Sequence, residues 1–193
     1  TLLVGTILEQ LGGLMGGALG SALIVVAAVA KKLTGAGIGI GVASRFRQPP
    51  LVTVSAATAG MIGAYAKEIH AGTLLSDGVF TLAGVGEPLG AFVAAYLAVE
   101  AGGLISGKTR IDILVTPIAT ICTGAAAGLS IGVPIATFMT AAGSLINWGA
   151  EQQPFWAGII VSALMGIALT LPISSAAIGI SLNLNGIAAG AAA

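Results

Sequence analysis

Long uncharged intervals separated by small groups of charged residues are the dominant pattern of this chain. Residues 11–30 are 20 uncharged positions between Glu9 and Lys31. As an α-helix they would be roughly 30 Å long, which matches the hydrocarbon thickness of a bilayer. This interval predicts one continuous transmembrane helix. Further apolar intervals predict four more spans, at residues 51–66, 89–105, 113–133 and 155–171.

Three other apolar segments have the wrong length for a standard span: residues 35–42, 73–86 and 134–146. Irregular backbone at membrane depth is stable only where protein or a water-filled cavity surrounds it, because unpaired amides are costly in lipid. We therefore expect broken or re-entrant elements around a cavity, as in transporters. The expected fold is all-α, a polytopic integral membrane protein with about 5–7 transmembrane helices plus these short segments.

Composition supports the membrane class and excludes several functions. Hydrophobic residues make up 56% of the 193 positions and charged residues only 7%, whereas a soluble domain has about 25% charged residues. The formal net charge is zero, so there is no basic field for nucleic acid. The single cysteine, Cys122, excludes an internal disulfide, and with the single histidine, His70, the sequence predicts no metal site and no cofactor.

The distribution of basic residues predicts the orientation. Six of the seven fall in two connections that would lie on the same side of the membrane, and by the positive-inside rule this side is cytoplasmic. Lys67 is the exception. The six residues are Lys31, Lys32, Arg45 and Arg47, expected to share one connection, and Lys108 and Arg110.

Gly12, Gly16 and Gly20 recur at four-residue spacing in the first predicted span. Such spacing lets a second helix backbone approach closely. The contact could form within one chain or across a dimer, and the spacing favours neither.

One motif invites a misleading interpretation. Residues 102–109 match the phosphate-loop pattern G-x-x-x-x-G-K-[ST], which needs a preceding buried strand and a following helix in a soluble domain. Here the preceding sequence is Ala-rich and helical and contains Glu100, and the following segment contains Pro117. We therefore interpret this motif as a glycine-rich cytoplasmic turn with two solvated cations.

Glu87 is the strongest candidate for binding a solute. It precedes Pro88, which is typical of a helix start, and it lies among Gly84, Gly86 and Gly90. The helix dipole keeps such a carboxylate ionised, and glycines leave room for a close approach. An ionised acceptor suits the hydroxyl groups of a sugar. The alternative is an exposed glutamate that only starts a helix.

Two further polar groups are candidates. His70 is predicted on the same side of the membrane as Glu87, and a neutral imidazole can donate to or accept from a hydroxyl; the alternative is a loop or capping residue. The second group combines amides, acids and an aromatic ring that could hold a sugar, although tryptophans are more often interfacial anchors. Its members are Asn147, Trp148, Glu151, Gln152 and Gln153.

Several segments resemble a known family. Residues 84–88, Gly-Val-Gly-Glu-Pro, resemble the Gly-Ile-Thr-Glu-Pro element of the membrane-embedded enzyme IIC subunits of the bacterial sugar phosphotransferase system. Residues 35–50, 153–155 and 171–178 more specifically resemble a divergent IIC-like family that includes PfoR-type regulatory proteins. This chain departs from the pentad by having Gly86 in place of threonine.

The resemblance implies a helical homodimer in the bacterial plasma (inner) membrane that binds a sugar in an occluded site and moves it by alternating access. Glu87 would accept the sugar hydroxyls, and a separate cytoplasmic IIB protein would supply phosphate, so any enzymatic role would be that of the translocation subunit. The alternative is a PfoR-like membrane sensor without net transport. Residues 1–193 are expected to form one transmembrane domain, truncated at both ends.

Overall fold

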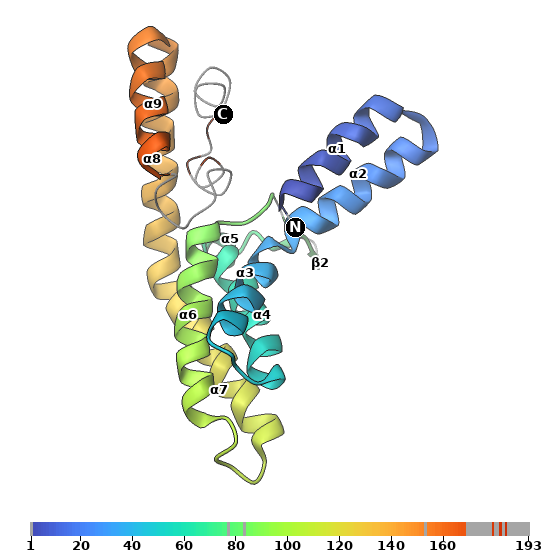
Figure 1. Ribbon diagram of the computed structural model, residues 1–193, viewed down its shortest axis with the longest axis vertical. Helices are drawn as coiled ribbons and strands as arrows, with labels where there is room; N and C mark the ends of the chain where they lie inside the picture. Colours follow the sequence, from blue (N-terminus) through green and yellow to red (C-terminus); the bar gives the residue numbers. More distant parts are fainter. Residues whose placement is uncertain are drawn as a thin grey trace. The chain divides into compact units, whose positions relative to one another are not determined.

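The computed structural model describes residues 2–76, 78–82, 84–152 and 154–168, together with residues 179, 182 and 184. The chain forms two compact units, Thr1–Val133 and Pro134–Ala193. Helices make up nearly all of the described chain, and the strands found there are two residues long (Figure 1). The prediction of an all-α membrane protein is confirmed.

The chain begins with a helical hairpin of α1 (Leu2–Met15) and α2 (Gly17–Lys32) (Figure 1). The prediction of one continuous span over residues 11–30 is wrong, because the chain reverses at Gly16 and Gly17, whose φ angles are 60° and 64°. Glycine adopts this left-handed conformation without steric cost. A Cβ atom on Gly12 would lie 2.8 Å from the carbonyl oxygen of Gly20, so the spaced glycines join two helices of the same chain.

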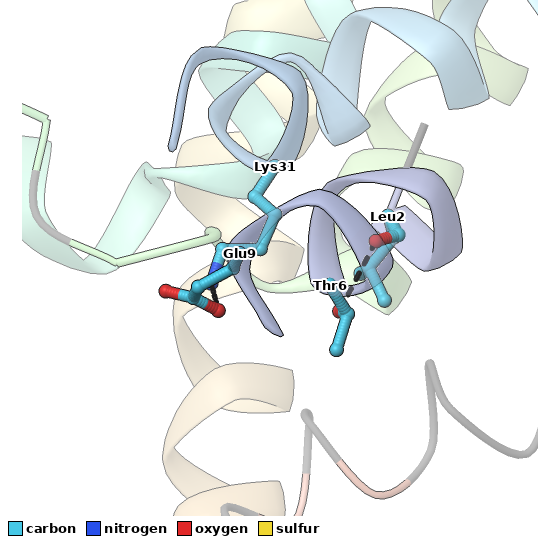
Figure 2. A network of polar contacts seen from close by, with 4 residues as sticks. All are labelled: Leu2, Thr6, Glu9 and Lys31. Carbon is cyan, nitrogen blue, oxygen red and sulfur yellow. Dashed lines mark hydrogen bonds and ion pairs between the residues drawn. The ribbon is translucent and has the colours of Figure 1, made fainter. Parts of the chain in front are cut away.

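An ion pair connects the two helices of this hairpin. Lys31 Nζ lies 2.6 Å from Glu9 Oε2 (Figure 2). A Cβ atom on Gly5 would lie 2.5 Å from Cγ of Lys31, so Gly5 provides the space for the lysine stem. The charges are paired between two otherwise apolar helices, which lowers the cost of holding them there.

Helix α3 (Thr34–Arg45) follows α2 after a bend of 46°. By length and composition, the two helices together could form one broken membrane span or a re-entrant loop, in agreement with the prediction for residues 35–42. The expectation that Lys31, Lys32, Arg45 and Arg47 share one connection is wrong, because α3 separates the two pairs.

The larger part of the first unit is a bundle of α3, α4 (Pro50–Ala64), α6 (Pro88–Ile105) and α7 (Asp112–Ala127) (Figure 1). Small residues at the contacts bring the backbones close together, which is how helices pack in lipid, where apolar burial gives no net drive. Large apolar side chains such as Leu104, Ile113 and Ile118 face outward. The fully buried alanines are Ala43, Ala56, Ala59, Ala91, Ala94, Ala95 and Ala98.

The connection from α4 to α6 contains the short helix α5 (Ala66–Ala71) and a two-stranded antiparallel hairpin of β1 (Leu75–Ser76) and β2 (Val79–Phe80). The side chains of Leu75, Val79 and Phe80 are exposed. Residues 73–86 therefore include a β-hairpin connection, and the prediction of a broken or re-entrant membrane element there is not supported by the described residues.

Residues 134–146 are not a separate short segment. They lie within α8 (Val133–Gln152), which continues from α7 through a π-helical turn, η1 (Gly128–Gly132). Residues Asp112–Gly149 form one apolar helix of 38 residues. The hydrogen-bond register changes between a π-helical and an α-helical turn, and Pro134, which lacks an N–H, is tolerated at that point. The helix α9 (Pro154–Ala168) follows.

Among the described residues, two helices are long and apolar enough to cross a membrane: Pro88–Ile105, which confirms the predicted span 89–105, and Asp112–Gly149. The bent pair α2 and α3 would be a third. The predicted spans 51–66 and 155–171 correspond to α4 and α9, each of 15 residues. The total of about 5–7 spans and the single-domain organisation stay predictions.

Candidate functional site

Glu87 is the N-cap residue of α6, as its position before Pro88 predicted. Its Oε2 accepts a hydrogen bond from the backbone N–H of Gly90. Its own backbone N–H donates to the carbonyl oxygen of Ala64 at 2.7 Å. The other carboxylate oxygen, Oε1, is buried and has no hydrogen-bond partner among the described residues. Glu87 is therefore held by its backbone N–H and by one carboxylate oxygen.

The loop before Glu87 is held against the end of α4. Gly84 and Gly86 have φ angles of 69° and 77°, in the region that glycine favours. A Cβ atom on Gly86 would lie 2.9 Å from Cβ of Ala64. The hydroxyl of Tyr65 donates to the carbonyl oxygen of Gly84 at 3.3 Å. Glycine in place of the threonine of the pentad is thus required here by both the backbone conformation and the lack of space.

Glu68 is a second carboxylate of interest, just after the break between α4 and α5. The sequence did not point to it as a site residue. Tyr65 separates α4 from α5 with φ −109°, and Glu68 lies in the first turn of α5. Glu68 Oε2 is buried and also has no partner in the described part of the chain. No local motif marks Glu68 in the sequence, and the helix α5 that carries it contacts both η1 and α4.

Glycine residues bring three backbones together beside Glu87. A Cβ atom on Gly128 would lie 3.0 Å from Cα of Gly63, and one on Gly132 would lie 3.7 Å from Cα of Gly90. Gly128 and Gly132 belong to η1, Gly63 to α4 and Gly90 to α6. Ser130 Oγ, within η1, donates to the carbonyl oxygen of Ala126 at 2.6 Å. Single π-helical turns occur often at functional sites, and this one lies against the Glu87 turn.

The other predicted site residues lie on α5 and on α8. His70 is exposed near the end of α5. Asn147, half-buried, and Glu151 and Gln152, both exposed, lie on α8 in the second compact unit. Their membership of the site stays a prediction. Gln153 and residues 171–178 lie outside the described residues.

Trp148, the aromatic member of the second predicted group, and Trp156 also lie in the second unit. The side chains of Trp148 and Trp156 are exposed, and the ring of Trp156 meets that of Phe155 edge-on with centroids 5.6 Å apart. Exposed tryptophans suit an interfacial anchor.

The phosphate-loop spelling of residues 102–109 does not form a phosphate cradle. It covers the C-terminal turn of α6, which ends at Ile105, whereas a phosphate cradle requires the free amides of a helix N-terminus. The N–H of Gly107 donates to Asp112 Oδ1 at 2.9 Å. The interpretation of this motif as a glycine-rich turn is supported.

Comparison with known proteins gives the family. No curated protein and no solved structure matches this chain. The family model described as phosphotransferase system, EIIC, matches residues 1–193. That family carries out membrane transport. The described helices that are long and apolar enough to cross a membrane agree with this role. The match covers the whole sequence, and the chain therefore belongs to the EIIC family of the phosphotransferase system.

Proposed function

We propose that this protein binds a sugar at Glu87 and moves it across the membrane by alternating access. The observation that carries the proposal is the buried Oε1 of Glu87, which has no partner among the described residues. A buried acceptor without a partner costs about 1–3 kcal/mol. A sugar hydroxyl that donates to this oxygen would recover that cost.

The surroundings of Glu87 support a specific binding geometry. Oε2 is occupied by the N–H of Gly90, which orients the carboxylate, and the N–H of Glu87 is held by Ala64. The acceptor is thus fixed before the ligand arrives, and less side-chain entropy is lost on binding. The carboxylate of Glu68, near the same helix break, offers a second unpartnered oxygen.

The irregular elements beside Glu87 supply the parts that would move. The break at Tyr65 and the π-helical turn η1 interrupt regular hydrogen bonding on two sides of the site. Changes in either would reposition the groups around Glu87 and open it alternately to the two membrane faces. The protein would position the sugar, and a cytoplasmic IIB protein would supply the phosphate.

The partners and location follow from the same proposal. As an EIIC protein, the chain would work as a homodimer in the bacterial inner membrane, with a IIB phosphocarrier on its cytoplasmic side. The family match gives no support to the alternative of a PfoR-like regulator. Sugar uptake into proteoliposomes distinguishes the two, because a regulator would bind sugar without accumulating it.

The direct test is Glu87→Gln. A glutamine has one carbonyl oxygen, for which the N–H of Gly90 and a sugar hydroxyl would compete. A thermal-shift screen of sugars on the purified full-length protein in detergent first identifies the ligand. We expect Glu87→Gln to weaken binding of that sugar by more than about tenfold, or roughly 1.4 kcal/mol, with membrane insertion unchanged.

Glu100→Gln is the matched control, because Glu100 is an exposed glutamate on the same helix. It should leave the affinity for the sugar unchanged. An unchanged affinity in Glu87→Gln would reduce Glu87 to a helix cap and refute the proposal.

A further inference from the structure

We propose that the end of the bundle opposite Glu87 binds the phosphate of an anionic phospholipid headgroup. The binding surface, here called the basic end, comprises the connections that join α3 to α4 and α6 to α7, at residues 46–49 and 106–111. Its cations are Arg47, Lys108 and Arg110 of these connections, together with Arg45 in the last turn of α3.

Contacts between the elements bring the two connections together. The rings of Phe46, which ends α3, and Tyr96 of α6 meet edge-on with centroids 5.7 Å apart. A Cβ atom on Gly103, in the last turns of α6, would lie 2.7 Å from Nε2 of Gln48. The cations that flank these contacts thus belong to one surface, and Figure 1 shows both connections at the same end of the bundle.

The cations of the basic end are not neutralised by the protein. All four side chains are exposed, and none takes part in an ion pair within the described ranges, where the pair of Lys31 and Glu9 is the one observed. Two acids lie near them. Asp112 Oδ1 accepts from Gly107 N–H and from Thr116 Oγ1, and Glu100 is exposed on α6. An excess of positive charge remains for an anion.

The backbone at Arg47 is a second, independent observation. Its φ angle is 52°, the one positive value outside glycine among the described residues. The N–H of Arg47 donates to Ser44 and that of Gln48 to Ala43, a helix ending in which the left-handed position is usually glycine. The same offset after α6 is indeed occupied by a glycine, Gly107, with φ 76°. Arginine at this strained position is explained if its cation binds a ligand.

The apolar side chains around the cations favour a lipid over a soluble acidic protein. Phe46, Leu104, Ile111 and Ile113 are 44%, 67%, 60% and 74% exposed, and they lie beside the four cations in sequence. Apolar side chains in the hydrocarbon with cations just beyond them place the cations at the level of the lipid phosphates.

Retention of lipid by the purified full-length protein tests the proposal. The protein in detergent is mixed with dioleoyl phosphatidylglycerol or dioleoyl phosphatidylcholine, and bound lipid is counted by native mass spectrometry. We expect several-fold more phosphatidylglycerol than phosphatidylcholine. Arg47→Gly should lower phosphatidylglycerol retention about fivefold, the effect of one cation near a membrane surface, and should not lower the melting temperature in lipid-free detergent. Arg47→Lys, which keeps the charge, should retain the lipid.

Lys67→Gln is the matched control, because Lys67 is an exposed cation in the α5 region, away from the basic end. It should leave retention unchanged. Equal retention of the two lipids, or full retention in Arg47→Gly, would refute the proposal. So would the finding that an acidic soluble protein, and not phosphatidylglycerol, requires Arg47 for binding. None of these results depends on whether Glu87 binds a sugar.

Discussion

The two ends of the α3–α7 bundle hold charge in opposite ways. At the end with Glu87, one carboxylate oxygen of Glu87 and one of Glu68 are buried without a partner in the described part of the chain, and neighbouring backbones approach closely at Gly63, Gly90 and Gly128. At the basic end, four cations are exposed on two short connections. The first end combines fixed geometry with unpartnered acceptor atoms, and the second combines mobile side chains with unneutralised charge.

This difference suggests a division of roles along one bundle. A fixed, buried acceptor can distinguish one arrangement of hydroxyl groups from another, because misplaced donors leave buried groups unpaired. Exposed, flexible cations attract any lipid phosphate that lies at their depth in the membrane, without such selectivity. Specificity is therefore expected at the packed end and anchoring at the basic end.

The largest loss of stability is expected from a substitution at the closely packed end of the bundle. In Gly63→Ala the new methyl group would collide with the Cβ atom of Ala94 and the carbonyl oxygen of Gly90. The backbones cannot separate without disturbing the Glu87 turn. We expect a loss of stability of about 2–3 kcal/mol, measured by thermal and denaturant unfolding in detergent.

Gly103→Ala is the control at the basic end. There the new methyl group meets the flexible amide of Gln48, which can turn away, and alanine favours a helix over glycine by up to about 1 kcal/mol. Stability should be unchanged or slightly higher. Equal losses in the two variants would show that the ends are packed alike.

The sequence could predict Glu87 because its signal is local. A proline after a glutamate marks a helix start, and the structure places Glu87 at the N-cap of α6. Glu68 has no such signal. The helix that carries it, α5, contacts η1, which lies some sixty positions away in the sequence, and hydropathy carries no information about that contact.

Two errors in the predicted spans have physical causes. Residues 11–30 have the same hydropathy whether they form one span or two helices joined by a turn. The outcome depends on the left-handed backbone at Gly16 and Gly17. Hydropathy cannot distinguish these cases. Residues 134–146 are too short for a separate span, but the π-helical turn before Pro134 accommodates the proline within one continuous helix.

A medium effect is expected from the acid that organises the basic end. Asp112→Ala removes the acceptor for the N–H of Gly107 and for Oγ1 of Thr116. Because these bonds are made to a charged group, we expect a loss of about 1–2 kcal/mol in unfolding experiments. Sugar affinity should not change, since the site lies at the other end. Weaker sugar binding in this variant would show that the two ends are coupled.

The smallest effect tests how the Glu87 turn is held. Tyr65→Phe removes the bond from the tyrosine hydroxyl to the carbonyl oxygen of Gly84, which is long at 3.3 Å, so stability should fall by only about 0.5–1 kcal/mol. The ring remains to fill its buried position, and the N–H of Glu87 still binds Ala64. If the loop orients Glu87, sugar affinity should fall two- to fivefold, whereas an unchanged affinity would mean that the backbone bond to Ala64 positions the carboxylate by itself. Measuring both quantities on the same preparation separates loop positioning from general stability, because Asp112→Ala lowers stability without touching this turn.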